Sequence, residues 1–154
     1  MEDLDHRIVG LLLRDGRMSF TDLGKVTGLS TSAVHQRVRR LEERGVIQGY
    51  RAIVDQSELG MPLIAFISVT PTDPSAPDDV PDRLRDISGI EACHSVAGEE
   101  SYILKARVAT PGDLEDLLAL VRSSAGVSTR TTVVLSTPWE ERPHPLTHAV
   151  RPIA

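Results

Sequence analysis

Residues 19–45 constrain the fold of this chain more than any other stretch, because they carry the signals for two helices joined by a short turn. Ser19 has the side chain of an N-cap, and Gly28 is placed to end the helix that follows it. Ser30 then predicts the cap of a second helix that runs to about Arg44, before a glycine. This order of helix, glycine-containing turn and helix is typical of a helix-turn-helix motif.

The second of these helices is predicted to have one apolar and one polar face. At about 100° per residue, Val34, Val38 and Leu41 share the face that we expect to pack on the preceding helices. The opposite face, its flanks and the N-terminal end of the helix carry side chains suited to DNA. We take as DNA-binding candidates Ser30, Thr31, Ser32, His35, Gln36, Arg39 and Arg40.

Each candidate has a role that follows from its chemistry. Arg39 can donate two hydrogen bonds to guanine, and Gln36 can pair with adenine. The hydroxyls of residues 30–32 and the helix N-terminus suit phosphate oxygens. Glu43 lies on the same exposed face near the C-terminal end, where a carboxylate repels phosphate, so we expect the N-terminal half to read the groove. The alternative is an amphipathic helix whose basic face is only solvated.

A further helix is expected ahead of the motif, over residues 3–14, from the spacing of Leu4, Ile8, Leu11 and Leu12. In the helix that follows it, Leu23 and Val26 are the expected inward positions. Residues 46–55 are predicted to form a short strand leading out of this part of the chain. The sequence thus predicts a three-helix domain with a connecting strand over residues 1–60.

The net charge of −5 is unevenly distributed along the chain. Residues 1–60 hold nine basic and nine acidic side chains, whereas residues 61–154 hold eight and thirteen. The basic side chains of the first part cluster late in it, at Arg37, Arg39, Arg40, Arg44 and Arg51. Local charge sets phosphate attraction, because salt screens fields over roughly 8–10 Å. We therefore expect the first part to bind DNA and the acidic remainder to stay off it.

Residues 61–137 alternate between strand and helix signals. Strands are expected at 63–71, 91–98, 101–109 and 128–136, a loop at 72–79, and helices over about 80–87 and from Thr110 onward. The order βαββαβ is the ferredoxin-like arrangement, which makes the whole chain α+β. Residues 138–154 form a proline-rich tail that we expect to be extended or disordered.

Several classes of function are disfavoured. No apolar run approaches the roughly 20 residues of a membrane span, the N-terminus does not resemble a secretory signal, and the single Cys93 fits a reducing cytoplasm. Cys93 and His94 are neighbours on a strand and point to opposite faces, so we expect no catalytic pair and no enzyme. His144 and His148 in the tail have no cysteine or paired carboxylate beside them, so we expect no metal site.

The chain resembles the Lrp/AsnC, or feast/famine, family of regulators, and most of all its actinobacterial members. The segments that carry the resemblance are LDHRIVGLLLRDGRMSFTDLGKVTGLS (4–30), RVRRLEERGVIQGY (37–50), AGEESYILKARV (97–108) and AGVSTRTTVVL (125–135). Together they cover roughly residues 3–137. The resemblance implies homodimers in which the four-stranded sheets of the two subunits face each other. These dimers are expected to assemble to an octamer. The strand near 51–55 is expected to pair with the same strand of the partner subunit.

The resemblance also implies that an amino acid or a related small molecule binds near the turn between the second and third strands, at a junction between dimers. On this chain the implied effector residues are Ala97, Gly98, Glu99, Glu100, Ser101 and Tyr102, with Thr131 and Thr132 from a neighbouring subunit. The family turn reads Gly-x-x-Asp-Tyr, and Ser101 stands here in place of the Asp. Glu99 or Glu100 can replace that anion or be a plain exposed turn residue, and Tyr102 can instead be an interface aromatic.

The leading hypothesis is therefore a transcriptional regulator that binds double-stranded DNA as a homo-oligomer and responds to an amino-acid effector, with no other cofactor. It would act in the cytoplasm, associated with the bacterial nucleoid. The alternative is an architectural DNA-binding protein of broad specificity with no effector, which the altered turn allows.

Overall fold

The computed structural model describes residues 2–143, so the tail beyond 143, with His144 and His148, lies outside the described residues. The chain divides into two compact units. One comprises residues 2–53 together with 139–143, and the other comprises residues 54–138. The division falls within the connecting segment.

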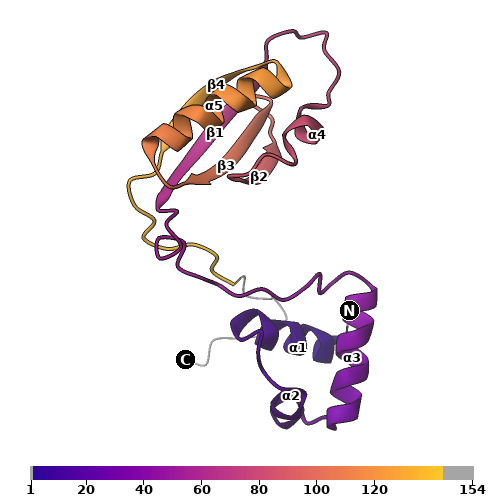
Figure 1. Ribbon diagram of the computed structural model, residues 1–154. Coiled ribbons are helices and arrows are strands. Elements are labelled where there is room, and N and C mark those ends of the chain that lie inside the picture. Colours follow the sequence, from indigo (N-terminus) through magenta and orange to yellow (C-terminus); the bar gives the residue numbers. More distant parts are fainter. Residues whose placement is uncertain (1, 144–154) are drawn as a thin grey trace. The chain divides into compact units, whose positions relative to one another are not determined.

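The N-terminal unit is built from three helices, α1 (Asp3–Arg14), α2 (Phe20–Thr27) and α3 (Thr31–Glu43), shown in Figure 1. Their apolar faces meet in a core of Ile8, Leu23, Val34, Val38 and Leu41, each at most 1% exposed. The predicted helices and the inward face of α3 are confirmed.

Capping residues fix where α2 begins and ends and where α3 begins, and so define the turn between them. The Ser19 hydroxyl accepts the amide of Asp22 at the start of α2, and the Ser30 hydroxyl accepts the amide of Ala33 at the start of α3. Gly28 closes α2 at φ 76°, a conformation that favours glycine.

One inward position of α2 was predicted wrongly. Val26 is 49% exposed, and the buried positions are Leu23, Gly24 and Thr27. The Thr27 hydroxyl is satisfied there, because it donates to the Leu23 carbonyl at 2.6 Å. α2 has only eight residues, so its buried positions are the ones that face α3. The spacing of apolar residues in the sequence does not show which side that is.

The predicted strand at 46–55 is not formed in this chain. The amides of Val46 and Ile47 both donate to the Leu41 carbonyl, so the chain folds back on α3 before it leaves the unit. Ile53 is 84% exposed beyond that point. A strand needs a partner for its ladder, and the described part of the chain supplies none for this segment.

The C-terminal unit is a four-stranded antiparallel sheet with two helices on one face (Figure 1). Its elements in chain order are β1 (Leu63–Pro71), α4 (Val80–Leu84), β2 (Ile90–Ser95), β3 (Tyr102–Val108), α5 (Pro111–Ala125) and β4 (Val127–Val133). The spatial order is β2-β3-β1-β4. The predicted α+β class and βαββαβ order are confirmed, although β2 and β4 end three residues earlier than predicted.

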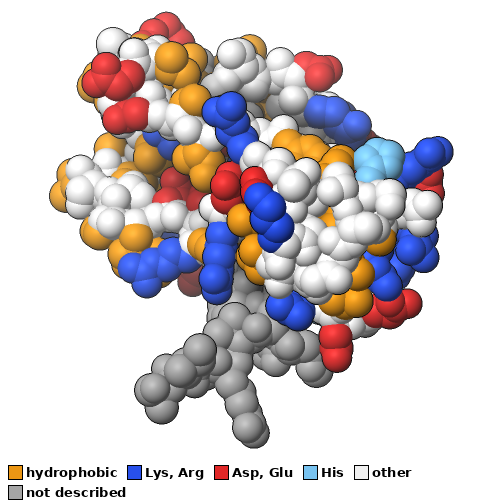
Figure 2. Space-filling view, turned by 90° about the horizontal axis from the view of Figure 1, so that it is seen from below, with side chains coloured by type: hydrophobic (Ala, Val, Ile, Leu, Met, Phe, Trp, Pro, Cys, Tyr) orange, Lys and Arg blue, Asp and Glu red, His pale blue; other side chains and the backbone are white. Residues whose placement is uncertain are grey.

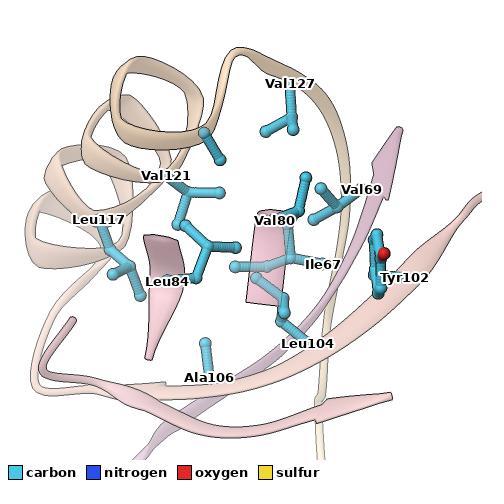
Figure 3. Close-up of a cluster of buried hydrophobic side chains, with 11 residues drawn as sticks. Ile67, Val69, Val80, Leu84, Tyr102, Leu104, Ala106, Leu117, Val121 and Val127 are labelled. Atoms are coloured by element: carbon cyan, nitrogen blue, oxygen red, sulfur yellow. The ribbon is translucent and has the colours of Figure 1, made fainter. Parts of the chain in front are cut away.

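The alternation of β1 separates the two faces of this sheet. Ala65, Ile67 and Val69 are fully buried and point toward the helices. Ile67 and Val69 join the core of Figure 3 with side chains from β3, α4 and α5. The intervening side chains of β1 lie on the other face, which neither helix covers. We call this second face the open face, and Phe66 on it is 43% exposed.

Candidate functional site

The polar side of α3 carries most of the predicted DNA-binding side chains. Thr31, Ser32, His35, Gln36, Arg39 and Arg40 are all exposed. Ser30 is exposed as well, but its hydroxyl caps the helix and lies 3.1 Å from the Ser32 hydroxyl. The His35 and Phe20 rings pack edge to face with 5.3 Å between their centroids, so His35 lies against the start of α2.

Arg37, in the same basic cluster, has a different environment. Its Nη1 donates to Asp5 and Glu2 of the first helix region at 2.8 Å each, and its side chain is only 18% exposed. These hydrogen bonds raise the pKa of the Arg37 guanidinium. Arg37 therefore fastens α3 to the N-terminal end of α1.

Acidic side chains accompany the arginines of α3. Arg39 donates from Nε to Glu43 at 2.8 Å, one turn further along the helix. Arg40 makes a longer contact of 3.4 Å with the Gln36 carbonyl. On the face drawn in Figure 2, red Asp and Glu side chains lie next to blue Lys and Arg side chains at several places. The Arg39–Glu43 pair was not anticipated, although the spacing of four residues between opposite charges was the signal for it.

A second candidate site is a hollow of about 270 Å³ in the C-terminal unit. It is lined by Ser68, Thr70, Glu99, Glu100, Ser128, Thr129 and Arg130. We call it the sheet hollow, since the open-face side chains of β1 and β4 meet the β2–β3 turn there.

Two carboxylates and one guanidinium face each other in the sheet hollow. Arg130 lies 3.7 Å from the Glu100 carboxylate and 3.9 Å from that of Glu99. Ser68 donates to Glu100 at 2.9 Å, and this bond, aided by the nearby guanidinium, lowers the pKa of the Glu100 carboxyl. The Glu100 side chain is 19% exposed and that of Glu99 is 90% exposed, so Glu100 is the better-held anion.

The structure brings only part of the predicted effector set into this hollow. Glu99 and Glu100 line it, while Ala97, Gly98 and Ser101 belong to the turn beside it. The Ser101 amide donates to the Val69 carbonyl, which ties the turn to β1.

Tyr102 and Thr131 lie on the helix-covered face instead. Tyr102 is 4% exposed and its hydroxyl donates to the Asp78 carboxylate, which raises its pKa to about 12. Thr131 pairs with buried Ile67, whereas Thr132 pairs with Phe66 and shares the open face. Sequence reasoning missed Ser68, Thr70, Ser128 and Arg130, because only the strand register places them at the turn.

Neither a metal-binding cluster nor a membrane-spanning helix is found within residues 2–143. No group of three or more His, Cys, Asp or Glu side chains there is arranged to hold a metal ion. None of the helices in the described part of the chain is long and apolar enough to cross a membrane.

Comparison with known proteins places both units in one family. Residues 1–42 match the AsnC-type helix-turn-helix domain, and residues 63–144 match the Lrp/AsnC ligand binding domain. The chain is 50% identical over 144 residues to the HTH-type transcriptional regulator LrpA of Mycobacterium tuberculosis, covering 94% of this chain and 96% of that protein. It is 36% identical over 140 residues to the leucine-responsive regulatory protein of Escherichia coli K12, covering 88% and 85%.

Solved structures agree with this assignment. A feast or famine regulatory protein from M. tuberculosis, complexed with L-methionine, superimposes with a TM-score of 0.91 at 50% identity, over 93% of this chain and 97% of that one. The fold, the two matched domains and these relatives together show that the chain belongs to the Lrp/AsnC family of transcriptional regulators.

Proposed function

We propose that α3 reads double-stranded DNA and that the sheet hollow binds the amino-acid effector of this regulator. On α3, Gln36 and Arg39 would contact base edges, because they are exposed on one face of the helix. Thr31 and Ser32 at its N-terminal end would contact phosphates, with Arg40 and His35 at the flanks. The Ser30 hydroxyl contributes by holding the helix N-terminus.

Replacing Arg39 by Ala tests the reading role. The variant should lose about 1–3 kcal/mol of binding free energy and relax base preference at one position per half-site, because a bidentate contact to guanine is lost. Binding is measured on a duplex that the wild-type protein selects from a random pool. Arg17→Ala, in the loop before α2, removes the same charge and should keep the base preference. Equal base preference in Arg39→Ala and wild type would remove Arg39 from the reading set.

The observation that carries the effector proposal is the meeting of Arg130 with Glu99 and Glu100 in one hollow. An α-amino acid has a carboxylate and an ammonium group, and it complements such a pair of opposite charges. Its carboxylate would bind the Arg130 guanidinium, and its ammonium would bind Glu100, with Ser68 holding the acceptor. The turn residues Ala97, Gly98 and Ser101 shape the rim. Tyr102 supports the turn from the opposite face.

We further propose a homodimer that assembles to an octamer. The open face leaves Phe66 exposed, and the segment around Ile53 has no strand partner among residues 2–143. Both features suit pairing with a second copy, which would bring Thr132 near a neighbouring hollow, while Thr131 points toward the helices of its own unit. The regulator would act in the cytoplasm, on nucleoid DNA. A catalytic role is not proposed, since Cys93 and His94 lie opposite Leu104 and Ile103 and so point to different faces.

A thermal-shift screen against the standard amino acids, followed by calorimetry, tests the effector proposal. At least one amino acid should stabilise the protein, and Glu100→Gln should abolish that shift while Glu115→Gln, on α5, leaves it. The competing architectural role predicts that no amino acid stabilises the protein or changes its DNA binding.

A further inference from the structure

The Arg39–Glu43 contact uses one particular edge of the guanidinium. The hydrogen bond of 2.8 Å runs from Nε of Arg39 to Oε1 of Glu43. Both side chains are exposed to solvent, at 71% for Arg39 and 58% for Glu43. Because Nε donates to Glu43, Nη1 and Nη2 remain available as donors at the outer edge of the guanidinium, the edge farthest from the helix backbone.

That outer edge matches the acceptors of guanine. Guanine presents O6 and N7 side by side in the major groove, and a guanidinium meets them with two parallel N–H donors. A free arginine side chain samples many rotamers, so a contact that restricts it in advance reduces the entropy lost on binding. Glu43 supplies such a restriction from within the same helix.

We propose that Glu43 is a positioning residue that orients the Arg39 guanidinium for guanine. The inference rests on the proposed reading role of Arg39. From sequence alone, the Glu43 carboxylate is expected only to repel phosphate and so to shorten the DNA-facing surface of α3. In this proposal it also orients Arg39. The negative charge adds a second effect, because it repels phosphates and so weakens binding to DNA that offers no guanine at the correct place.

Glu42 provides a matched control on the same helix. It is the neighbouring acidic residue, and its carboxylate accepts a hydrogen bond from the Tyr50 hydroxyl at 3.0 Å, not from an arginine. Neutralising Glu42 changes the charge of the domain by the same amount as neutralising Glu43. A difference between the two variants therefore reports the Arg39 contact and not net charge.

The experiment compares Glu43→Asp, Glu43→Gln and Glu42→Gln in the full chain. Each is titrated with the pool-selected duplex, with versions of it carrying single guanine replacements, and with a scrambled duplex. Glu43→Asp keeps the charge but is one methylene shorter, so guanine discrimination should fall about tenfold while scrambled-duplex affinity is unchanged. Glu43→Gln keeps an acceptor for Nε but loses the charge that strengthens the bond, so it should lose part of the discrimination and also bind the scrambled duplex more tightly. Glu42→Gln should show only the second effect.

Two results would overturn the inference, and they are distinguishable. If Glu43→Asp discriminates guanine as wild type does while Arg39→Ala does not, the positioning role is wrong and the reading role stands. If Arg39→Ala keeps full guanine discrimination, the reading role itself fails. Thermal unfolding of each variant verifies that α3 remains folded.

Discussion

The carbonyl oxygen of Leu29 lies 2.6 Å from the position that a Cβ on Gly24 would occupy. The Leu29 amide also donates to the Gly24 carbonyl at 3.0 Å, so the turn folds back onto α2 at this point. Only a residue without a side chain allows this approach. Gly24 therefore sets how closely α3 can begin beside α2, and with it the placement of the polar face of α3.

Gly24→Ala should destabilise the N-terminal unit by about 1–3 kcal/mol, because backbone must shift to admit the methyl group. Chemical denaturation followed by helical circular dichroism measures the loss. Gly16→Ala is the control, since its Cβ would lie 3.8 Å from the nearest atom and its φ is not in the left-handed region. Equal midpoints for the two variants would show that the turn tolerates a side chain at position 24.

A second prediction concerns Arg37, which we expect to stabilise the domain, in contrast to the exposed arginines of α3, which we expect to contact DNA. Arg37→Ala leaves Asp5, which is 8% exposed, without its guanidinium partner. We expect a loss of about 1–3 kcal/mol in the free energy of unfolding. Arg40→Ala, on the exposed side of the same helix, should stay within about 0.5 kcal/mol of wild type.

The double variant Asp5→Leu/Arg37→Met distinguishes a buried-charge penalty from lost helix contact. Removing both charges should recover much of the stability that Arg37→Ala loses, because no uncompensated carboxylate remains. A double variant as unstable as the single one would mean that the ion pair itself, and not the unpaired Asp5, accounts for the loss.

Much of the fold could be predicted because local signals agree with the tertiary structure. Ser19, Ser30 and Thr110 each cap a helix where the sequence predicts one, and Thr110 forms a full capping box with Asp113. The apolar run at 63–71 likewise forms β1, as predicted.

What could not be predicted depends on contacts between distant residues. The exposure of Val26 depends on which side of α2 meets α3, and the arrangement of Ser68, Glu100 and Arg130 depends on strand register. Tyr102 follows the turn directly in sequence. Because side chains alternate along a strand, it points to the helix-covered face and not to the open face on which the sheet hollow lies. Proximity in sequence to a candidate site is thus a poor guide within a strand.

Tyr102 gives a prediction in pH. Its hydrogen bond to Asp78, together with burial, raises its pKa from 10.0 to about 12. Because the folded-state pKa exceeds the unfolded value, the stabilisation is complete below pH 10.0 and is lost as the pH rises toward 12. Tyr102→Phe should lower stability at neutral pH and remove this alkaline component from urea midpoints.

Tyrosinate absorbance checks the same assignment directly. Tyr102→Phe should abolish the most alkaline titration step, and Asp78→Asn should shift that step to lower pH. Tyr50→Phe, which removes the other tyrosine of the chain, should leave it in place. Burial and a hydrogen bond to Glu42 raise the pKa of Tyr50 as well, so one alkaline step should remain in Tyr102→Phe. A remaining step as alkaline as the one near pH 12 in wild type would assign that step to Tyr50.

Ser68 should control the ionisation of Glu100 and, through it, amino-acid binding. Its hydrogen bond is the main cause of the lowered pKa of Glu100, so Ser68→Ala should raise that pKa toward 4.5. A lowered folded-state pKa keeps the carboxylate charged as the pH falls. Amino-acid binding by the wild-type protein should therefore persist to lower pH than binding by Ser68→Ala.

NMR titration of the Glu100 carboxyl carbon and calorimetry measure the two effects, with Thr70→Val as the control in the same hollow. If binding by Ser68→Ala has the pH profile of wild type, Glu100 is not the group that holds the ligand ammonium.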